Sequence, residues 1–286
     1  MSQIRKGMFC IMGSAFFFSL MNIFVRLSGD IPSIQKSFFR NIVAALFALI
    51  ILLKNKEDIS YEKKDLPMLI LRSTFGTLGI LCNFYAVDHL VVSDASMLNK
   101  LSPFFVIVFS SLFLKEKANN VQKISVFIAF LGALFVIKPS ADFLSNAASL
   151  IAILGALGAG IAYTCVRQLG KQGVAGPKIV FFFSTFSSVV VLPWIVLNYT
   201  PMSTVQVVTL LLAGLSAAGG QFCITFAYKF APAKEISVYD YTQIVFSAAL
   251  GFFVLGQIPD IWSVVGYTII TGVGVWSFFR QKKMSS

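Results

Sequence analysis

The sequence predicts an all-α integral membrane protein of ten transmembrane helices, arranged as two inverted five-helix repeats. Three observations lead to this fold class. The 286 residues are 57% hydrophobic and only 12% charged, far from the composition of a soluble domain. The apolar residues come in runs of about 20, the length that crosses a hydrocarbon core of about 30 Å. Finally, the second half of the chain repeats the first half at one constant offset.

The expected spans use up most of the chain, so we expect no separate soluble domain and place any functional site among the helices. The first span follows Arg5 and Lys6, as in a signal peptide. It is too long for one and lacks a clear cleavage site, so we expect it to be retained. The spans cover residues 7–27, 32–53, 67–87, 93–114, 121–137, 149–167, 178–197, 205–228, 236–256 and 261–279.

The internal repeat is clearest in the third span of each half. Residues 79–86 read GILCNFYA, and residues 220–227 read GQFCITFA. We expect the two copies to occupy residues 1–140 and 141–286. Each copy holds five spans, an odd number, so the copies should cross the membrane in opposite orientations. Inverted repeats of this kind are typical of carriers that open alternately to either side.

Basic residues fall almost entirely in the loops on one side of the predicted membrane. The opposite loops carry only Lys138. This bias predicts a multi-pass protein with both termini in the cytoplasm. It also explains the net charge of +11 without a nucleic-acid partner. The short loops on the opposite side fit a bacterial inner (plasma) membrane, with a eukaryotic organelle as the alternative. The basic residues on the amino-terminal side are Arg5, Lys6, Lys54, Lys56, Lys63, Lys64, Lys115, Lys117, Lys123, Arg167, Lys171, Lys178, Lys229, Lys234, Arg280, Lys282 and Lys283.

Two cations are expected deep in the outer half of the membrane. Arg40 should lie about 12 Å below the outer boundary, and Lys100 about 10 Å. A charge at a helix centre costs on the order of 2.5–3.5 kcal/mol unless it is paired or faces a cavity. We therefore expect both to bind a carboxylate or phosphate, although Arg40 could instead bond helix carbonyls. Arg26 and Lys36 lie nearer the surface and can extend to the headgroups.

Asp240 is the one acid well inside a predicted span, about 6 Å from the cytoplasmic boundary, and Arg72 has a similar depth. A salt bridge between Arg72 and Asp240 would form a cytoplasmic-side gate. Alternatively, the two residues reach the interface independently, or Asp240 binds a coupling proton.

Polar residues mark the fourth and ninth spans as the lining of a pathway. Polar side chains in lipid-embedded helices favour protein interfaces or water, so the same residues could also serve as contacts between helices. Pro103 lacks an N–H and should kink the fourth span. Besides Lys100 and Asp240, the expected lining residues are Ser96 and Asn99 in the fourth span, and Ser237, Tyr239, Tyr241 and Gln243 in the ninth. Asn22 and Asn83 are weaker candidates, and the small residues 155–160 permit close helix packing.

The side chains needed for catalysis are missing from the pattern. The four cysteines all fall inside spans without metal-ligand spacing, and the chain has one histidine. We therefore expect no enzyme, no metal and no cofactor. A channel is disfavoured because the chain lacks a repeated filter loop or a ring of charges.

The stretch from Leu78 to Pro139 resembles the EamA-domain branch of the drug/metabolite transporter superfamily. The resemblance rests on residues 83–86 (NFYA), 93–96 (SDAS), 101–104 (LSPF), 114–117 (LKEK) and 132–133 (GA), which the second half repeats more weakly through 226–228 (FAY) and 255–257 (LGQ). It implies a ten-helix carrier with a central cavity. The chain departs from the family pattern at Phe18, where tryptophan is common, and at Ile244, which corresponds to Pro103.

Together these features predict a secondary transporter of a small organic anion or zwitterion, such as an amino acid or a carboxylate metabolite. Its partners would be this substrate and the lipid bilayer, with a proton as the candidate coupling ion, in a monomer or homodimer. Alternating access would come from rocking of spans three, four, eight and nine. The alternative is a proton-coupled exporter of cationic or amphipathic drugs that uses Asp240. The excess of intramembrane cations favours the anion.

Overall fold

The structure is a computed structural model that describes residues 2–89, 98–137, 147–256, 258 and 260–284. Within these residues the regular secondary structure is entirely helical. The first half contains α1 (Gln3–Leu27), α2 (Ser33–Lys54), α3 (Leu66–His89), α5 (Ser102–Phe113) and α6 (Asn120–Ile137). The second half contains α7 (Ala147–Lys171), α8 (Gly176–Asn198), α9 (Thr204–Phe230), α10 (Ala233–Ile236), the 3₁₀ helix η1 (Ser237–Tyr241), α11 (Thr242–Leu255) and α12 (Ile261–Met284).

Seven of the described helices are long and apolar enough to cross a membrane: α1, α2, α3, α7, α8, α9 and α12. Two shorter apolar helices, α5 and α6, accompany them. The expected all-α fold with several membrane spans is therefore confirmed for the described part of the chain. Many large apolar side chains on these helices point outward, as a lipid solvent requires.

Two expected spans are not continuous helices. In the span at 93–114, α5 begins only at Ser102, with Pro103 in its first turn. The single helix expected over 236–256 is a wrong prediction, because α10 and η1 precede α11 there. A side-chain hydrogen bond favours this break, since the Thr242 hydroxyl donates to the Tyr239 carbonyl at 2.6 Å.

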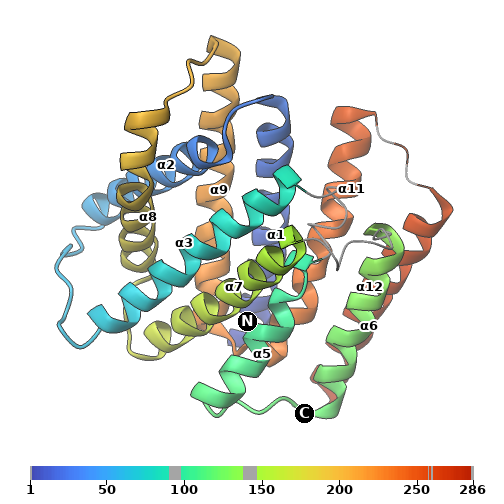
Figure 1. Ribbon diagram of the computed structural model, residues 1–286. Helices are drawn as coiled ribbons and strands as arrows, with labels where there is room; N and C mark the ends of the chain where they lie inside the picture. The colour runs from blue at the N-terminus through green and yellow to red at the C-terminus, as the bar shows by residue number, and fades with distance from the viewer. Residues whose placement is uncertain (1, 90–97, 138–146, 257, 259, 285–286) are drawn as a thin grey trace.

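Helices from the two halves pack against each other throughout the molecule. α1 lies along α9, α3 along α7, α2 along α8, and α6 along α12 (Figure 1). The closest approaches occur at glycines. A Cβ on Gly158 would lie 2.9 Å from the Phe75 carbonyl oxygen, and one on Gly266 would lie 2.5 Å from that of Gly132. The small-residue string at 155–160 therefore lets α7 contact α3 backbone to backbone, as expected.

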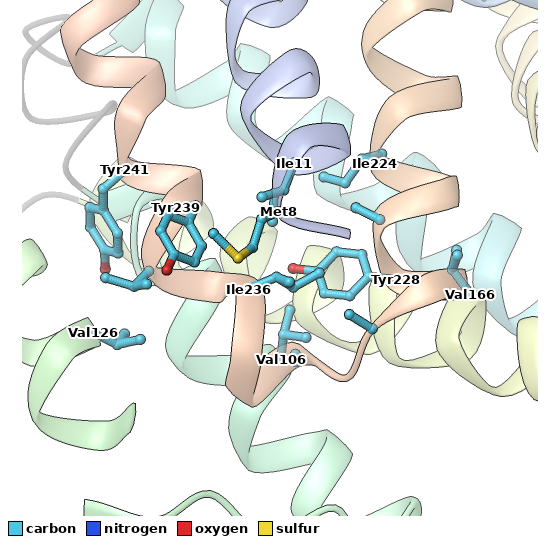
Figure 2. Packing of buried hydrophobic residues seen from close by; sticks show 14 of the residues in the cluster. Met8, Ile11, Val106, Val126, Val166, Ile224, Tyr228, Ile236, Tyr239 and Tyr241 are labelled. Atoms are coloured by element: carbon cyan, nitrogen blue, oxygen red, sulfur yellow. The ribbon is translucent and has the colours of Figure 1, made fainter. Parts of the chain in front are cut away.

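The largest apolar core surrounds the two broken spans. Figure 2 shows Tyr239 and Tyr241 of η1 beside Met8 of α1 and Ile236 of α10. Val106 of α5 belongs to the same cluster. This packing fixes the interrupted segments of both halves at one place in the interior of the molecule.

Candidate functional site

The interrupted segments of the two halves meet in a polar cluster formed by Lys100, Asp240, Tyr241 and Gln243. The Lys100 ammonium donates to Asp240 Oδ2 at 3.2 Å and to Gln243 Oε1 at 2.7 Å. The side chains of Lys100 and Asp240 are 9% and 13% exposed, so this is a buried ion pair. The two halves therefore share one ion pair at the point where their helices are broken.

The helix breaks themselves position these side chains. Pro103 has no N–H, and the Phe104 N–H donates to the Leu101 carbonyl. The usual helical donors therefore do not reach the Lys100 carbonyl. The Tyr241 hydroxyl donates to that carbonyl at 2.9 Å. Next to Lys100 in the chain, Asn99 Nδ2 donates to Asn83 Oδ1 of α3 at 2.9 Å. Side chains thus satisfy the backbone at this break, which allows irregular structure inside a membrane.

The expected salt bridge between Arg72 and Asp240 is not formed. Asp240 pairs with Lys100 instead, whereas Nε and Nη1 of Arg72 have no hydrogen-bond partner. The depth estimate failed because it treated span nine as one straight helix, and the break at η1 brings Asp240 to Lys100. Arg72 is 1% exposed and lies 3.5 Å from the centroid of the Phe183 ring on α8.

Arg40 is buried on α2, apart from the ion pair. Its Nη1 donates to Asn41 Oδ1 at 3.0 Å, and its guanidinium lies 5.8 Å from the Phe18 ring centroid. Asn41 in turn donates to Ser187 of α8 at 2.8 Å. Thus Arg40 bonds a side chain of its own helix, whereas Lys100 pairs with Asp240.

Of the other candidates, Ser237 and Tyr239 are buried in the core around η1. Ser96 lies outside the described residues. The site residues that the structure brings together are therefore Lys100, Asp240, Tyr241 and Gln243, with Asn99 beside them on the adjacent turn.

Tyr163 of α7 was not among the expected site residues. It interacts electrostatically with Asp240, Arg72 and Arg40, and its ring stacks on Tyr228 of α9 with centroids 5.2 Å apart. The sequence held a signal for it, because the repeat offset carries the weaker candidate Asn22 onto Tyr163.

A second ionic cluster lies where α5 and α7 end. Glu116 accepts from Arg167 Nη2 at 3.1 Å and from Lys171 Nζ at 2.7 Å. Arg167 Nη1 also donates to the Lys229 carbonyl at the end of α9, at 3.1 Å. The sequence prediction missed this role because it treated these residues as loop charges. They tie three helices together on the amino-terminal side.

Two surface cavities lie elsewhere. One of about 390 Å³ is formed by the loop before α3 and the loop before α8, and includes Tyr61, Asp65 and Lys178. The other, of about 500 Å³, is an apolar groove between α6 and α12 that includes Phe135 and Trp262. Neither is lined by the buried ion pair. No three metal-ligating side chains converge in the part of the chain that the structure describes.

The chain is similar in sequence to known membrane transporters. The model of the EamA-like transporter family matches residues 5–138 and again 146–279. The pseudopaline exporter CntI of Pseudomonas aeruginosa (strain UCBPP-PA14) is 32% identical over 282 residues, covering 98% of both chains. Solute carrier family 35 member G1 of Homo sapiens is 24% identical, covering 98% of this chain and 80% of that protein. A crystal structure with 12% identity has the same fold, with a TM-score of 0.81 over 93% of this chain and 95% of the other.

Proposed function

This chain belongs to the EamA-like transporter family, and we propose that it moves a small organic anion or zwitterion across the membrane by alternating access. Family and relatives establish the coarser statement that it is a membrane transporter of the drug/metabolite transporter type. The substrate class and the mechanism are the proposal, for which the buried ion pair is the main support.

The observation that carries the proposal is the Lys100–Asp240 pair at the junction of the two broken spans. Discontinuous helices near the middle of a transporter commonly form its substrate site. A buried ion pair is costly to desolvate, so it is weak evidence for stability and better explained by function. A zwitterion matches this pair, because its carboxylate can replace Asp240 at Lys100 and its ammonium can replace Lys100 at Asp240.

We further propose ten spans in two inverted repeats, residues 1–140 and 141–286. The double match of the family model supports this division. Helix packing supports it too: if α1 corresponds to α7 and α3 to α9, the α1–α9 contact and the α3–α7 contact are equivalent. The α2–α8 and α6–α12 pairs then lie on the symmetry axis. Spans three, four, eight and nine would rock against the rest.

The distribution of basic residues supports an inner (plasma) membrane location with both termini in the cytoplasm. In that orientation the Glu116–Arg167–Lys171 cluster lies on the cytoplasmic side. It would hold this side closed and release when the transporter opens inward.

Proton-coupled export of cationic or amphipathic compounds is the second candidate function. The name of the relative, an exporter, favours outward transport. Asp240 is the residue that would carry the proton. Proton-coupled export is the less favoured function because Lys100 already pairs with the Asp240 carboxylate. A cationic substrate would have to displace Lys100 and would leave it without an anionic partner.

A thermal-shift screen of the purified protein tests the substrate class. The panel contains carboxylates, zwitterions and organic cations, each up to millimolar concentration, because stabilisation grows with the logarithm of occupancy. We expect a carboxylate or zwitterion to raise the melting temperature of the wild type and of Lys123→Ala, an exposed lysine on α6. We expect no such rise in Lys100→Ala. Stabilisation by cations alone, unchanged in Lys100→Ala, would favour the second candidate instead.

A further inference from the structure

We infer that Arg72 and Arg40, together with Tyr163, form a second subsite that binds a second carboxylate of the substrate. This inference rests on the proposed function and makes it more specific. The substrate would be an amino acid that carries a second carboxylate. Its zwitterionic end lies at Lys100 and Asp240, and its second carboxylate lies at the arginines. Arg72 is then a substrate-binding residue rather than part of a cytoplasmic gate.

In the described part of the chain, Arg72 has no carboxylate partner. The side chain is fully buried, and neither Nε nor Nη1 has a hydrogen-bond partner. The titratable groups that act on it are Tyr163, Cys165 and Arg40, and no carboxylate is among them in the described residues.

Arg40 is joined to α8, the same helix that Arg72 contacts, because it donates to Asn41, which donates to Ser187 of α8. Ser187 lies one turn from Phe183, the ring under Arg72. Two buried guanidiniums without a carboxylate partner are unfavourable in a low-dielectric interior, so the pair attracts an anion.

The fold makes room for this guanidinium. Its carbon lies 3.5 Å from the centroid of the Phe183 ring, which fixes the plane of the group. A Cβ on Gly76, one turn along α3, would lie 2.5 Å from Nη1, so the glycine leaves the space that Arg72 fills. An arginine with an oriented plane and free donors suits a planar carboxylate better than a lysine would.

Among the described residues, no carboxylate pairs with Arg40 or Arg72. Asp240 is engaged by Lys100, and Lys100 is already neutralised by Asp240. The uncompensated positive charge of the interior is therefore at Arg40 and Arg72 rather than at Lys100. Tyr163 of α7 interacts electrostatically with both arginines and with Asp240, so it is within range of both ends. An amino acid with a second carboxylate complements both ends at once.

The test measures ligand-dependent melting temperature of the purified full-length protein with four probes: glutamate, succinate, inorganic phosphate and putrescine. The variants are Arg72→Gln, Arg72→Lys and, as a control, Arg26→Gln, which removes an exposed arginine at the end of α1. We expect glutamate to stabilise the wild type and Arg26→Gln equally. We expect its apparent affinity to fall at least tenfold in Arg72→Gln and to recover in part in Arg72→Lys.

Two results would overturn the inference while leaving the proposed function intact: equal glutamate affinity in Arg72→Gln and wild type, or glutamate binding lost only in Lys100→Ala. Stabilisation by phosphate alone would overturn the assignment to carboxylates. No stabilisation of the wild type by glutamate, succinate or phosphate would reject the proposed function as well. If Arg72→Gln does not fold, Phe183→Leu replaces it, because this variant keeps the Arg72 charge but removes the ring against which the guanidinium packs. Undiminished glutamate affinity in Phe183→Leu would also overturn the inference.

Discussion

At the scale of single residues, the hydroxyl of Tyr241 connects the two halves of the chain at the backbone. It donates to the carbonyl of Lys100, an acceptor that the helix break would otherwise leave unsatisfied. The Tyr241→Phe variant should lose about 1–3 kcal/mol of stability, the cost of a buried acceptor without a donor. Thermal melting in detergent checks this. The control Tyr199→Phe changes an exposed tyrosine and should melt like the wild type, so equal melting of both variants would contradict the account.

Gly76 gives a second residue-level prediction. An alanine Cβ there would lie 2.5 Å from Arg72 Nη1 and 2.9 Å from the Phe183 ring, so Gly76→Ala should push the guanidinium off the ring. Overpacking of this kind costs about 1–3 kcal/mol. Gly272→Ala on α12 is the matched control, because its Cβ would meet nothing within 4 Å. Melting temperature and glutamate-dependent stabilisation should both fall in the first variant only. A Gly76→Ala protein with the melting temperature and glutamate-dependent stabilisation of the wild type would argue against tight packing around Arg72.

The sequence predicted which charges lie inside the molecule but not their partners. Lys100, Asp240 and Arg72 were selected because charges are costly inside apolar runs, and all three are buried or nearly so. Which cation Asp240 pairs with depends on where a helix unwinds, and local composition does not encode that. Tyr163 was missed because an aromatic residue in an apolar helix carries no signal of its own in a chain with 30 phenylalanines.

At the scale of elements, the end of α5 is held to α7 by Glu116. This carboxylate is 12% exposed and pairs with both Arg167 and Lys171. Removing one partner of a buried ion pair costs about 3–5 kcal/mol, so Glu116→Gln should melt well below the wild type.

The control for Glu116 is an exposed ion pair on the same side of the molecule. Glu62 pairs with Lys64, and both side chains are more than half exposed, at 70% and 63%. Solvent screens such exposed pairs, so Glu62→Gln should leave the melting temperature almost unchanged. If both glutamine variants melt alike, the cluster around Glu116 does not hold α5 to α7.

The helices themselves followed from apolar run length, whereas their interruptions did not. Pro103 indicated the break before α5, because proline cannot donate a helical hydrogen bond. The corresponding residue of the second half is Ile244, a residue compatible with a helix, so no proline indicated the 3₁₀ segment η1. That break depends on tertiary partners, such as the Lys100 carbonyl that Tyr241 reaches.

At the scale of the whole molecule, the proposed orientation can be tested by cysteine labelling. Ser203 lies before α9 and Asp58 before α3, both exposed and on opposite sides in the proposed topology. In intact cells, a membrane-impermeant maleimide should label Ser203→Cys but should label Asp58→Cys only after permeabilisation. The native cysteines lie within helices. Labelling of the parent protein, which has no added cysteine, gives the background signal. Labelling of Asp58→Cys in intact cells would reverse the topology.

The central claim is that this transporter exchanges an organic anion or zwitterion at the buried ion pair. Counterflow in proteoliposomes tests it most directly. Vesicles loaded with unlabelled glutamate or another stabilising carboxylate are diluted into a trace of the labelled compound. The account predicts transient accumulation of label with the wild type and with Lys123→Ala, and at least a tenfold slower rate with Lys100→Ala. Counterflow of organic cations only, at a rate unchanged in Lys100→Ala, would contradict it.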